Sequence, residues 1–157
     1  MTEEDIRKEL KSQPFFEGLD DEFVQFLSKS AREHSLARGD VLFKQGDWAD
    51  AFYLLRDGEI LIEVPSISGP SLEIQRLQTG QILGWSWLIA PYKWTFQARA
   101  EADTQLLEFD GAAILAQCEE DPAFGYALLK RFSGLMSERL EAARRRMMDE
   151  WNPPGFA

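Results

Sequence analysis

Apolar residues recur at helical spacing near the N-terminus. Thr2 can cap a short helix over residues 2–11. A second helix, with Phe23 and Phe26 on its apolar face, is predicted to end near Arg32. The chain is therefore expected to begin with two helices.

The helical period returns after residue 110. A short helix is predicted over residues 112–119, and Asp121 followed by Pro122 supplies a cap and a first-turn proline for a longer one. This long helix is predicted to reach about Glu150, before a turn over residues 152–155. Its apolar face carries Phe124, Leu128, Phe132, Leu135, Met136, Leu140, Ala143 and Met147.

Between these helical ends, short apolar runs alternate with turn residues. Strands are predicted over residues 41–43, 51–55, 60–64, 72–77, 81–83, 96–100 and 106–109. Asp57-Gly58 lies between two such runs and predicts a β-hairpin. Regularly spaced short strands are typical of a sandwich or barrel. We expect one domain over residues 1–157, with helices over 1–34, strands over 35–110 and helices over 111–151.

The net charge and the cysteine content limit the partners and the cellular compartment that the sequence allows. The net charge of −10 over 157 residues disfavours nucleic acid and anionic membranes as partners, because both require a basic surface. The single cysteine excludes an intramolecular disulfide and favours a reducing compartment. No run of about 18 apolar residues is present, so we expect no membrane span and a cytoplasmic location.

The sequence contains no recognisable catalytic constellation. The only histidine, His34, is placed at the end of the second helix, and Cys118 has no histidine near it in sequence. We interpret Cys118 as a small buried residue and expect neither a metal site nor an enzyme. Turn geometry or solvation explains the carboxylates of Asp47, Asp50, Asp57, Glu101 and Asp103.

Five motifs, in order and at consistent spacing, resemble the cyclic-nucleotide-binding domain family. They are Pro14–Phe16, Gly39–Phe43, Gln45–Asp50, Phe52–Gly58 and Leu77–Gly84. This family is the sensor module of catabolite-activator-type regulators, of the regulatory subunit of cyclic-AMP-dependent kinase and of gated channels. The resemblance covers about residues 14–148. It implies a mainly β fold with flanking helices: a double-stranded β-helix (jelly-roll-like β-roll) of eight strands, followed by a long C-terminal helix.

The resemblance also implies a phosphate-binding cassette. In the family, a glycine is followed by a glutamate for the ribose 2′-hydroxyl, then a short helix and an arginine for the cyclic phosphate. Alignment on Gly84 without gaps puts Trp85 at the glutamate position and Trp94 at the arginine position. The nearest cations are Lys93 and Arg99. Lys93 could bring its charge toward the loop, but only as a point charge without the bidentate geometry of arginine, and Arg99 lies in the next predicted strand, where it can face either way.

Two interpretations of this degenerate cassette stand. The indole rings fill the cavity as core, or they line a pocket for a flat or apolar ligand. Binding of a cyclic nucleotide through backbone contacts alone is a third alternative, and no other cofactor is expected. The candidate ligand residues are Gly84, Trp85, Ser86, Trp87, Leu88, Lys93, Trp94 and Thr95.

The long helix predicts a homodimer. The residues expected to contact the partner are Leu128, Phe132, Leu135, Met136, Leu140 and Met147. Arg144, Arg145 and Arg146 are interpreted as a solvated face paired with Glu141 and Asp149. Only six residues follow Trp151, so no helix-turn-helix unit is expected.

Together these patterns predict a non-enzymatic regulatory or sensor domain. It would respond to a small-molecule ligand through its C-terminal helix and act on a protein partner of unknown identity. The alternatives are a genuine cyclic-AMP or cyclic-GMP binding protein, a relative of transcription regulators, and a protein-interaction module without a ligand.

Overall fold

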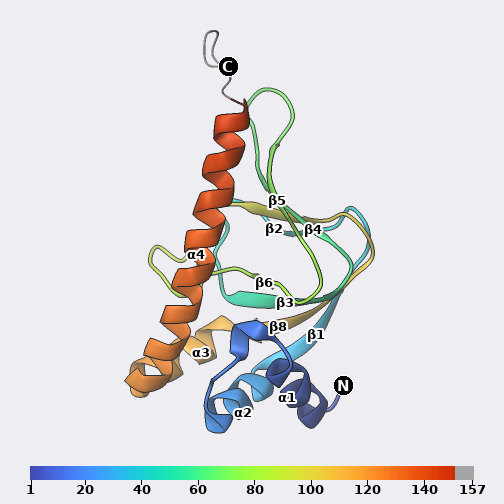
Figure 1. The fold of residues 1–157 in the computed structure, drawn as a ribbon. Helices are drawn as coiled ribbons and strands as arrows, with labels where there is room; N and C mark the ends of the chain where they lie inside the picture. Colours follow the sequence, from blue (N-terminus) through green and yellow to red (C-terminus); the bar gives the residue numbers. More distant parts are fainter. Residues whose placement is uncertain (151–157) are drawn as a thin grey trace.

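The computed structural model describes residues 1–150, and within them two antiparallel sheets are flanked by helices (Figure 1). This confirms the predicted mainly β roll with a long C-terminal helix. In chain order the elements are α1 (Glu3–Lys11), η1 (Pro14–Phe16), α2 (Asp21–Lys29), β1 (Ala31–Leu36), β2 (Val41–Phe43), β3 (Ala51–Asp57), β4 (Ile60–Val64), β5 (Leu72–Leu77), β6 (Ile82–Leu83), β7 (Gln97–Ala100), β8 (Thr104–Asp110), α3 (Gly111–Glu120) and α4 (Pro122–Glu150).

The two sheets exchange strands along the chain. One has the order β1-β8-β3-β6 and the other β2-β7-β4-β5. The hairpin predicted at Asp57-Gly58 is therefore wrong, because β3 and β4 belong to different sheets. The turn itself is present, with Gly58 at φ +103°, and a Cβ there would lie 2.4 Å from Thr104 Oγ1. The dipeptide fixes a tight corner, but it does not decide whether the flanking strands pair with each other.

The N-terminal boundary of the roll also differs from the prediction. The second helix ends at Lys29, and β1 begins at Ala31 and pairs antiparallel with β8. His34 therefore lies in a strand, where its Nδ1 is 3.8 Å from a carboxylate oxygen of Glu108. Only Leu36 is fully buried in β1, so the strand has almost no apolar signal and depends on its pairing with β8.

Aromatic stacking joins the roll to the first half of α4. Phe52 of β3 stacks on Phe109 of β8, with 4.4 Å between ring centroids. Phe132 of α4 packs edge-on against Phe52 and against Trp87 at 5.0 and 5.2 Å. The core end of α4 is thus fixed to the sheets, while the helix continues along one side of the roll (Figure 1).

This packing corrects the predicted partner face of α4. Leu128, Phe132 and Leu135 are buried in the chain's own core, so they are not available to a second subunit. Leu140 and Met147 are exposed, and Met136 is half-buried. The single apolar stripe in the sequence merges two faces of this helix, one that packs in the core and one that is exposed.

The predicted helix caps are confirmed. Thr2 Oγ1 accepts a hydrogen bond from the Asp5 N–H at 3.1 Å, and Asp121 Oδ1 accepts one from the Phe124 N–H at 3.3 Å. The turn predicted over residues 152–155 lies outside the described residues. Among residues 1–150, no helix has the length and apolar character needed to cross a membrane.

Candidate functional site

The predicted ligand residues lie on the loop between β6 and β7, which passes beside α4 (yellow-green in Figure 1). The loop begins at Gly84, which has φ +103°. A Cβ at Gly84 would lie 3.0 Å from ring atoms of Trp94, so glycine permits the close approach of the indole. Residues 86–91 form turns and not the short helix implied by the resemblance. A helix N-terminus for an anion is therefore missing from this loop.

Trp94, at the position aligned with the family's arginine, is part of the core. It is 5% exposed and stacks on Phe43 with 3.7 Å between centroids and an angle of 7° between ring planes. The backbone N–H of Trp94 donates a hydrogen bond to the Asp47 carbonyl at 2.9 Å. Side chain and backbone are both anchored, so Trp94 forms a fixed wall of the site.

Trp85, at the position aligned with the family's glutamate, lies at the rim. It is half-buried and meets Phe96 edge-to-face, with 5.9 Å between ring centroids. Phe96 is also only partly buried. These two rings form an outer wall with fewer anchors than the stack of Trp94 on Phe43.

Three predicted ligand residues lie elsewhere. Trp87 is buried in the central core, where its Nε1–H donates to the Gly84 carbonyl at 3.2 Å, and Leu88 packs against the same core. Lys93 points outward, with Nζ 4.8 Å from the ring centroid of the exposed Trp48. Lys93 therefore does not bring its charge into the cassette.

A small cavity lies inside the loop. It is lined by Phe43, Ile62, Leu83, Gly84, Trp85, Ser86, Trp94, Thr95, Phe96 and Arg139, five of which the sequence predicted. Its volume of about 10 Å³ is near the lower limit for admitting one water molecule. Pockets for drug-sized ligands occupy roughly 300–1,000 Å³, so the site is closed.

Arg139 is the site residue that the sequence analysis missed. It lies on α4, is 1% exposed, and donates to the side-chain oxygen of Gln75 and, at 3.3 Å, to the Ile82 carbonyl. Within residues 1–150 no carboxylate forms an ion pair with it. Burial lowers the pKa of Arg139 to about 10, opposed by the nearby Glu138. The spacing between Phe132 and Arg139 places both residues on the face of α4 that packs on the core. The sequence analysis missed this position because Arg139 is charged and was not counted in the apolar face.

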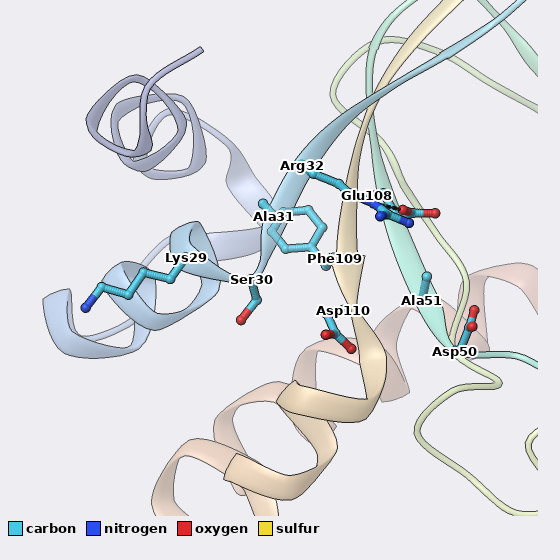
Figure 2. A pocket seen from close by; sticks show the side chains of 9 residues that line it. All are labelled: Lys29, Ser30, Ala31, Arg32, Asp50, Ala51, Glu108, Phe109 and Asp110. Carbon is cyan, nitrogen blue, oxygen red and sulfur yellow. Dashed lines mark hydrogen bonds and ion pairs between the residues drawn. The ribbon is translucent and has the colours of Figure 1, made fainter.

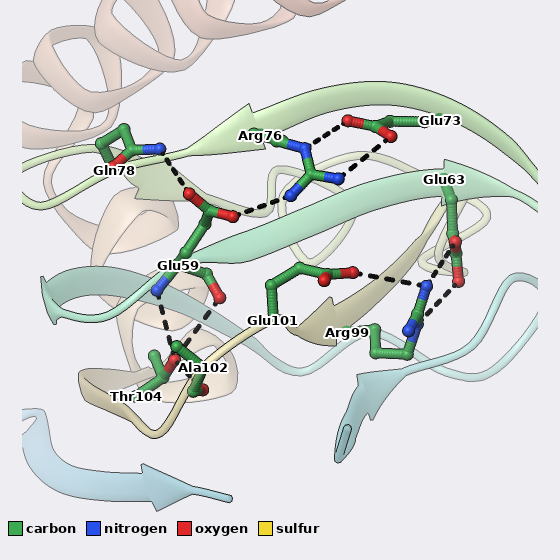
Figure 3. Close-up of polar contacts among 9 residues, drawn as sticks. All are labelled: Glu59, Glu63, Glu73, Arg76, Gln78, Arg99, Glu101, Ala102 and Thr104. Carbon is green, nitrogen blue, oxygen red and sulfur yellow. Dashed lines mark hydrogen bonds and ion pairs between the residues drawn. The ribbon is translucent and has the colours of Figure 1, made fainter. Parts of the chain in front are cut away.

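Arg99 is excluded from the cassette by its orientation. It extends from β7 on the outside of the sheet, toward Glu63 at 3.3 Å and Glu101 at 3.5 Å (Figure 3). Arg76 bridges Glu59 and Glu73 in the neighbouring cluster. These side chains satisfy one another on the sheet surface, so Arg99 does not substitute for the missing arginine.

A larger cleft of about 450 Å³ lies where β1 and β8 meet the ends of α2 and α3 (Figure 2). Arg32 pairs with Glu108 there, and Asp110 Oδ1 accepts the Ala113 N–H at 3.1 Å to cap α3. Among the described residues, no three potential metal ligands are grouped here or elsewhere. Arg32, Glu108 and Asp110 thus serve the fold, and the cassette remains the candidate site.

Cys118 is expected to react slowly. Burial, with help from Glu119 and Asp121, raises the pKa of its thiol to about 11. We expect iodoacetamide to modify the native protein at pH 8 about 100-fold more slowly than an exposed cysteine, because the thiolate is the reactive form. Mass spectrometry of native and urea-unfolded protein measures the ratio. Equal rates would identify an activated thiol and contradict the structural role.

The curated relatives are longer than this chain. It is 26% identical over 134 residues to the cyclic AMP receptor protein of Thermus thermophilus, covering 85% of this chain and 60% of that one. It is 27% identical over 111 residues to a candidate potassium channel protein of Rhodopseudomonas palustris, covering 70% of this chain and 26% of the other. The chain thus spans less than two thirds of either relative.

A solved structure and a family model both match this chain. A crystal structure of a candidate cyclic nucleotide-binding protein from Geobacter metallireducens matches with a TM-score of 0.77 and 28% identity, covering 85% of this chain and 97% of that one. The model of the cyclic nucleotide-binding domain matches residues 33–121, more than half of the sequence. The chain belongs to the cyclic nucleotide-binding domain family.

Proposed function

We propose that this chain is a non-enzymatic regulatory module in which aromatic packing has replaced the cyclic-nucleotide cassette. The observation that carries this proposal is Trp94, which is buried and stacked on Phe43 at the position aligned with the phosphate-binding arginine. Charge-assisted hydrogen bonds of the kind lost at Trp85 and Trp94 contribute about 1.5–3 kcal/mol each. A cyclic nucleotide would also have to open a cavity that now holds about 10 Å³.

The output of this module is α4. Its first half is fixed by Phe132 to the aromatic core, and Arg139 connects it to β5 and β6 through Gln75 and Ile82. The following turns of α4 extend beyond these anchors. A change at the cassette would therefore alter the position of the second half of the helix.

The surface that α4 offers to a partner is a stripe of seven residues, which we call the outer stripe. It consists of Tyr126, Leu129, Ser133, Met136, Leu140, Ala143 and Met147. These residues alternate at spacings of three and four, the repeat of a left-handed coiled coil. Five of the seven are exposed, and no charged residue interrupts the stripe. We propose a second copy of this chain as the partner, because a repeat that continues through successive turns fits another helix of the same repeat.

The experiment that tests the cassette is a thermal-shift titration with cyclic AMP and cyclic GMP. A ligand at about one hundred times its dissociation constant adds about 2.7 kcal/mol of stability, or about 5–10 °C for a chain of this size. We expect neither nucleotide, at about 1 mM, to raise the melting temperature by more than about 1 °C. A protein that binds cyclic AMP serves as the positive control. A rise of several degrees would reject the proposal and show that backbone groups suffice for binding.

A further inference from the structure

Large apolar side chains are exposed at the tip of the loop between β6 and β7, outside the cassette. Trp48, Ile89 and Tyr92 are all exposed, Trp48 to 71%. Trp48 comes from the loop between β2 and β3 and lies opposite Lys93 in a short antiparallel bridge. The β6–β7 loop projects from the roll beside α4 (Figure 1). We call Trp48, Ile89, Tyr92 and Lys93 the aromatic patch.

Backbone hydrogen bonds hold this patch in place. The Ala49 N–H donates to the Tyr92 carbonyl at 2.8 Å, and the Tyr92 N–H donates to the Ile89 carbonyl at 3.0 Å. Tyr92 has φ +60°, a left-handed conformation that is unfavourable for a bulky residue and that the surrounding contacts must maintain. Nearby, Trp94 anchors the loop in the core by its stack on Phe43. A surface held in this way loses little conformational entropy when it binds a partner.

The charge along the β6–β7 loop is opposite in sign to the net charge of the chain. Asp and Glu supply 27 of the 157 residues, but none occurs between Glu73 and Glu101, a stretch that contains the whole loop. Lys93 is the charged residue of the loop itself. A chain with a net charge of −10 thus has no acid in this loop.

Two lysines near Trp48 carry charge that the described part of the chain does not pair. Lys93 Nζ lies 4.8 Å from the Trp48 ring centroid, and Lys44 is exposed in the turn before Trp48; neither forms an ion pair with a described residue. The acid nearest to Trp48 in sequence is Asp47. It lies on the other side of the bridged segment, because successive side chains of an extended segment alternate. The face that presents Trp48 is therefore apolar and positively charged.

We propose that the aromatic patch binds an acidic segment of another protein, in which a large apolar side chain is flanked by aspartate or glutamate. The apolar side chain packs on Trp48 and Ile89, and a flanking carboxylate pairs with Lys93. Tryptophan and tyrosine are enriched at the centres of protein interfaces, where a few such residues carry most of the binding energy. This surface is separate from the outer stripe of α4, and its partner does not depend on what the cassette binds.

The net charge of the chain does not prevent this contact. At physiological ionic strength the screening length is about 8 Å, so acids remote from the patch act weakly on a segment bound there. A membrane is a different case, because an extended anionic surface would also face the acids around the patch. A short segment meets the β6–β7 loop alone, so the observations favour a peptide over a lipid surface.

Selection from a random library of peptides of about 12 residues, displayed on phage, tests the proposal. The full chain is the bait at about 0.15 M salt. A parallel selection on Trp48→Ala identifies peptides that bind elsewhere. We expect the peptides that bind only the wild type to carry several acids beside a large apolar residue. The dissociation constant of the leading peptide is then measured by fluorescence anisotropy.

Trp48→Ala should weaken binding of this peptide at least about thirtyfold, because the aromatic anchor is lost. Circular dichroism should show that this variant folds as the wild type does, since the side chain is largely exposed. Lys93→Gln should weaken binding about five- to tenfold, and the remaining affinity should fall less steeply with added salt.

Ile67→Ala and Lys130→Gln are the matched controls. Ile67 is fully exposed on the hairpin between β4 and β5, and Lys130 is exposed on α4. Neither residue belongs to the aromatic patch or to the outer stripe. Both variants should bind the leading peptide with the dissociation constant of the wild type.

The proposed partner is overturned if no peptide distinguishes the wild type from Trp48→Ala, if the selected peptides are basic or uncharged, or if a control variant weakens binding as much as Trp48→Ala. Vesicles of phosphatidylserine and phosphatidylcholine that bind the wild type but not Trp48→Ala would assign the patch to a membrane. A dimer that Trp48→Ala dissociates would assign it to a second copy, and either result rejects an acidic partner segment. The cassette is tested separately, by the titration with cyclic nucleotides.

Discussion

Trp94→Ala is expected to destabilise the protein by about 3–5 kcal/mol. The indole is 5% exposed, stacks on Phe43 at 3.7 Å and lies against Gly84, whose missing side chain makes room for it. Removing the ring loses its burial energy and leaves a cavity that the anchored neighbours cannot refill. Urea unfolding followed by circular dichroism measures the change.

Trp48→Ala is the matched control for this variant. Trp48 is 71% exposed, and its ring contact is with the Lys93 ammonium group. We therefore expect a loss of at most about 0.5–1 kcal/mol. Equal effects at the two positions would mean that Trp94 does not fill the cassette in solution, and the proposal of a filled site would fail.

The Trp94→Ala cavity provides a further readout. A dry apolar cavity made by a large-to-small substitution can bind an aromatic molecule of similar shape. Indole is therefore expected to raise the melting temperature of Trp94→Ala while leaving that of the wild type unchanged. Stabilisation of both proteins by indole would show that the wild-type cassette is already open, contrary to the small volume of its cavity.

Most strands could be predicted because their apolar pattern is local. Runs such as Ile60–Val64 and Leu72–Leu77 match the observed strands residue for residue. In contrast, the sequence predicts the end of a helix where β1 begins, because five of the six residues of β1 are not fully buried and its partner β8 is distant in sequence. The corner at Gly58 shows the same limit, since turn chemistry specifies a backbone angle and not the pairing of strands.

The site could be predicted only where it is built from one loop. Gly84, Trp85, Ser86, Trp94 and Thr95 line the cavity as expected, because a contiguous loop encloses it. Arg139 approaches from α4, and no local pattern reports which loop a helix covers. The sequence did contain one signal for Arg139: it is a charged residue on the helix face whose other residues pack on the core. It distinguishes Arg139 from Arg144, which is exposed and pairs with Glu141 at 2.9 Å.

Leu140→Glu is expected to weaken the proposed dimer at least about 100-fold. Leu140 is 70% exposed at the middle of the outer stripe, and a two-fold axis between parallel helices would bring it close to its own copy. Each copy would lose about 1.5–3 kcal/mol of leucine burial, and the two new carboxylates would repel each other. Sedimentation equilibrium over a concentration series measures the dissociation constant.

Met148→Glu separates loss of the stripe from a change in helix charge. Met148 is 58% exposed, lies near Leu140 on the same helix, and falls outside the three-and-four repeat. Met148→Glu adds the same charge as Leu140→Glu, but the dimer of this variant should have the dissociation constant of the wild type. A dimer that withstands Leu140→Glu would place the interface on another surface, and a monomeric wild type would refute the partner proposed for α4. Both variants should keep the wild-type melting temperature when measured as monomers, because neither side chain is buried within its own chain.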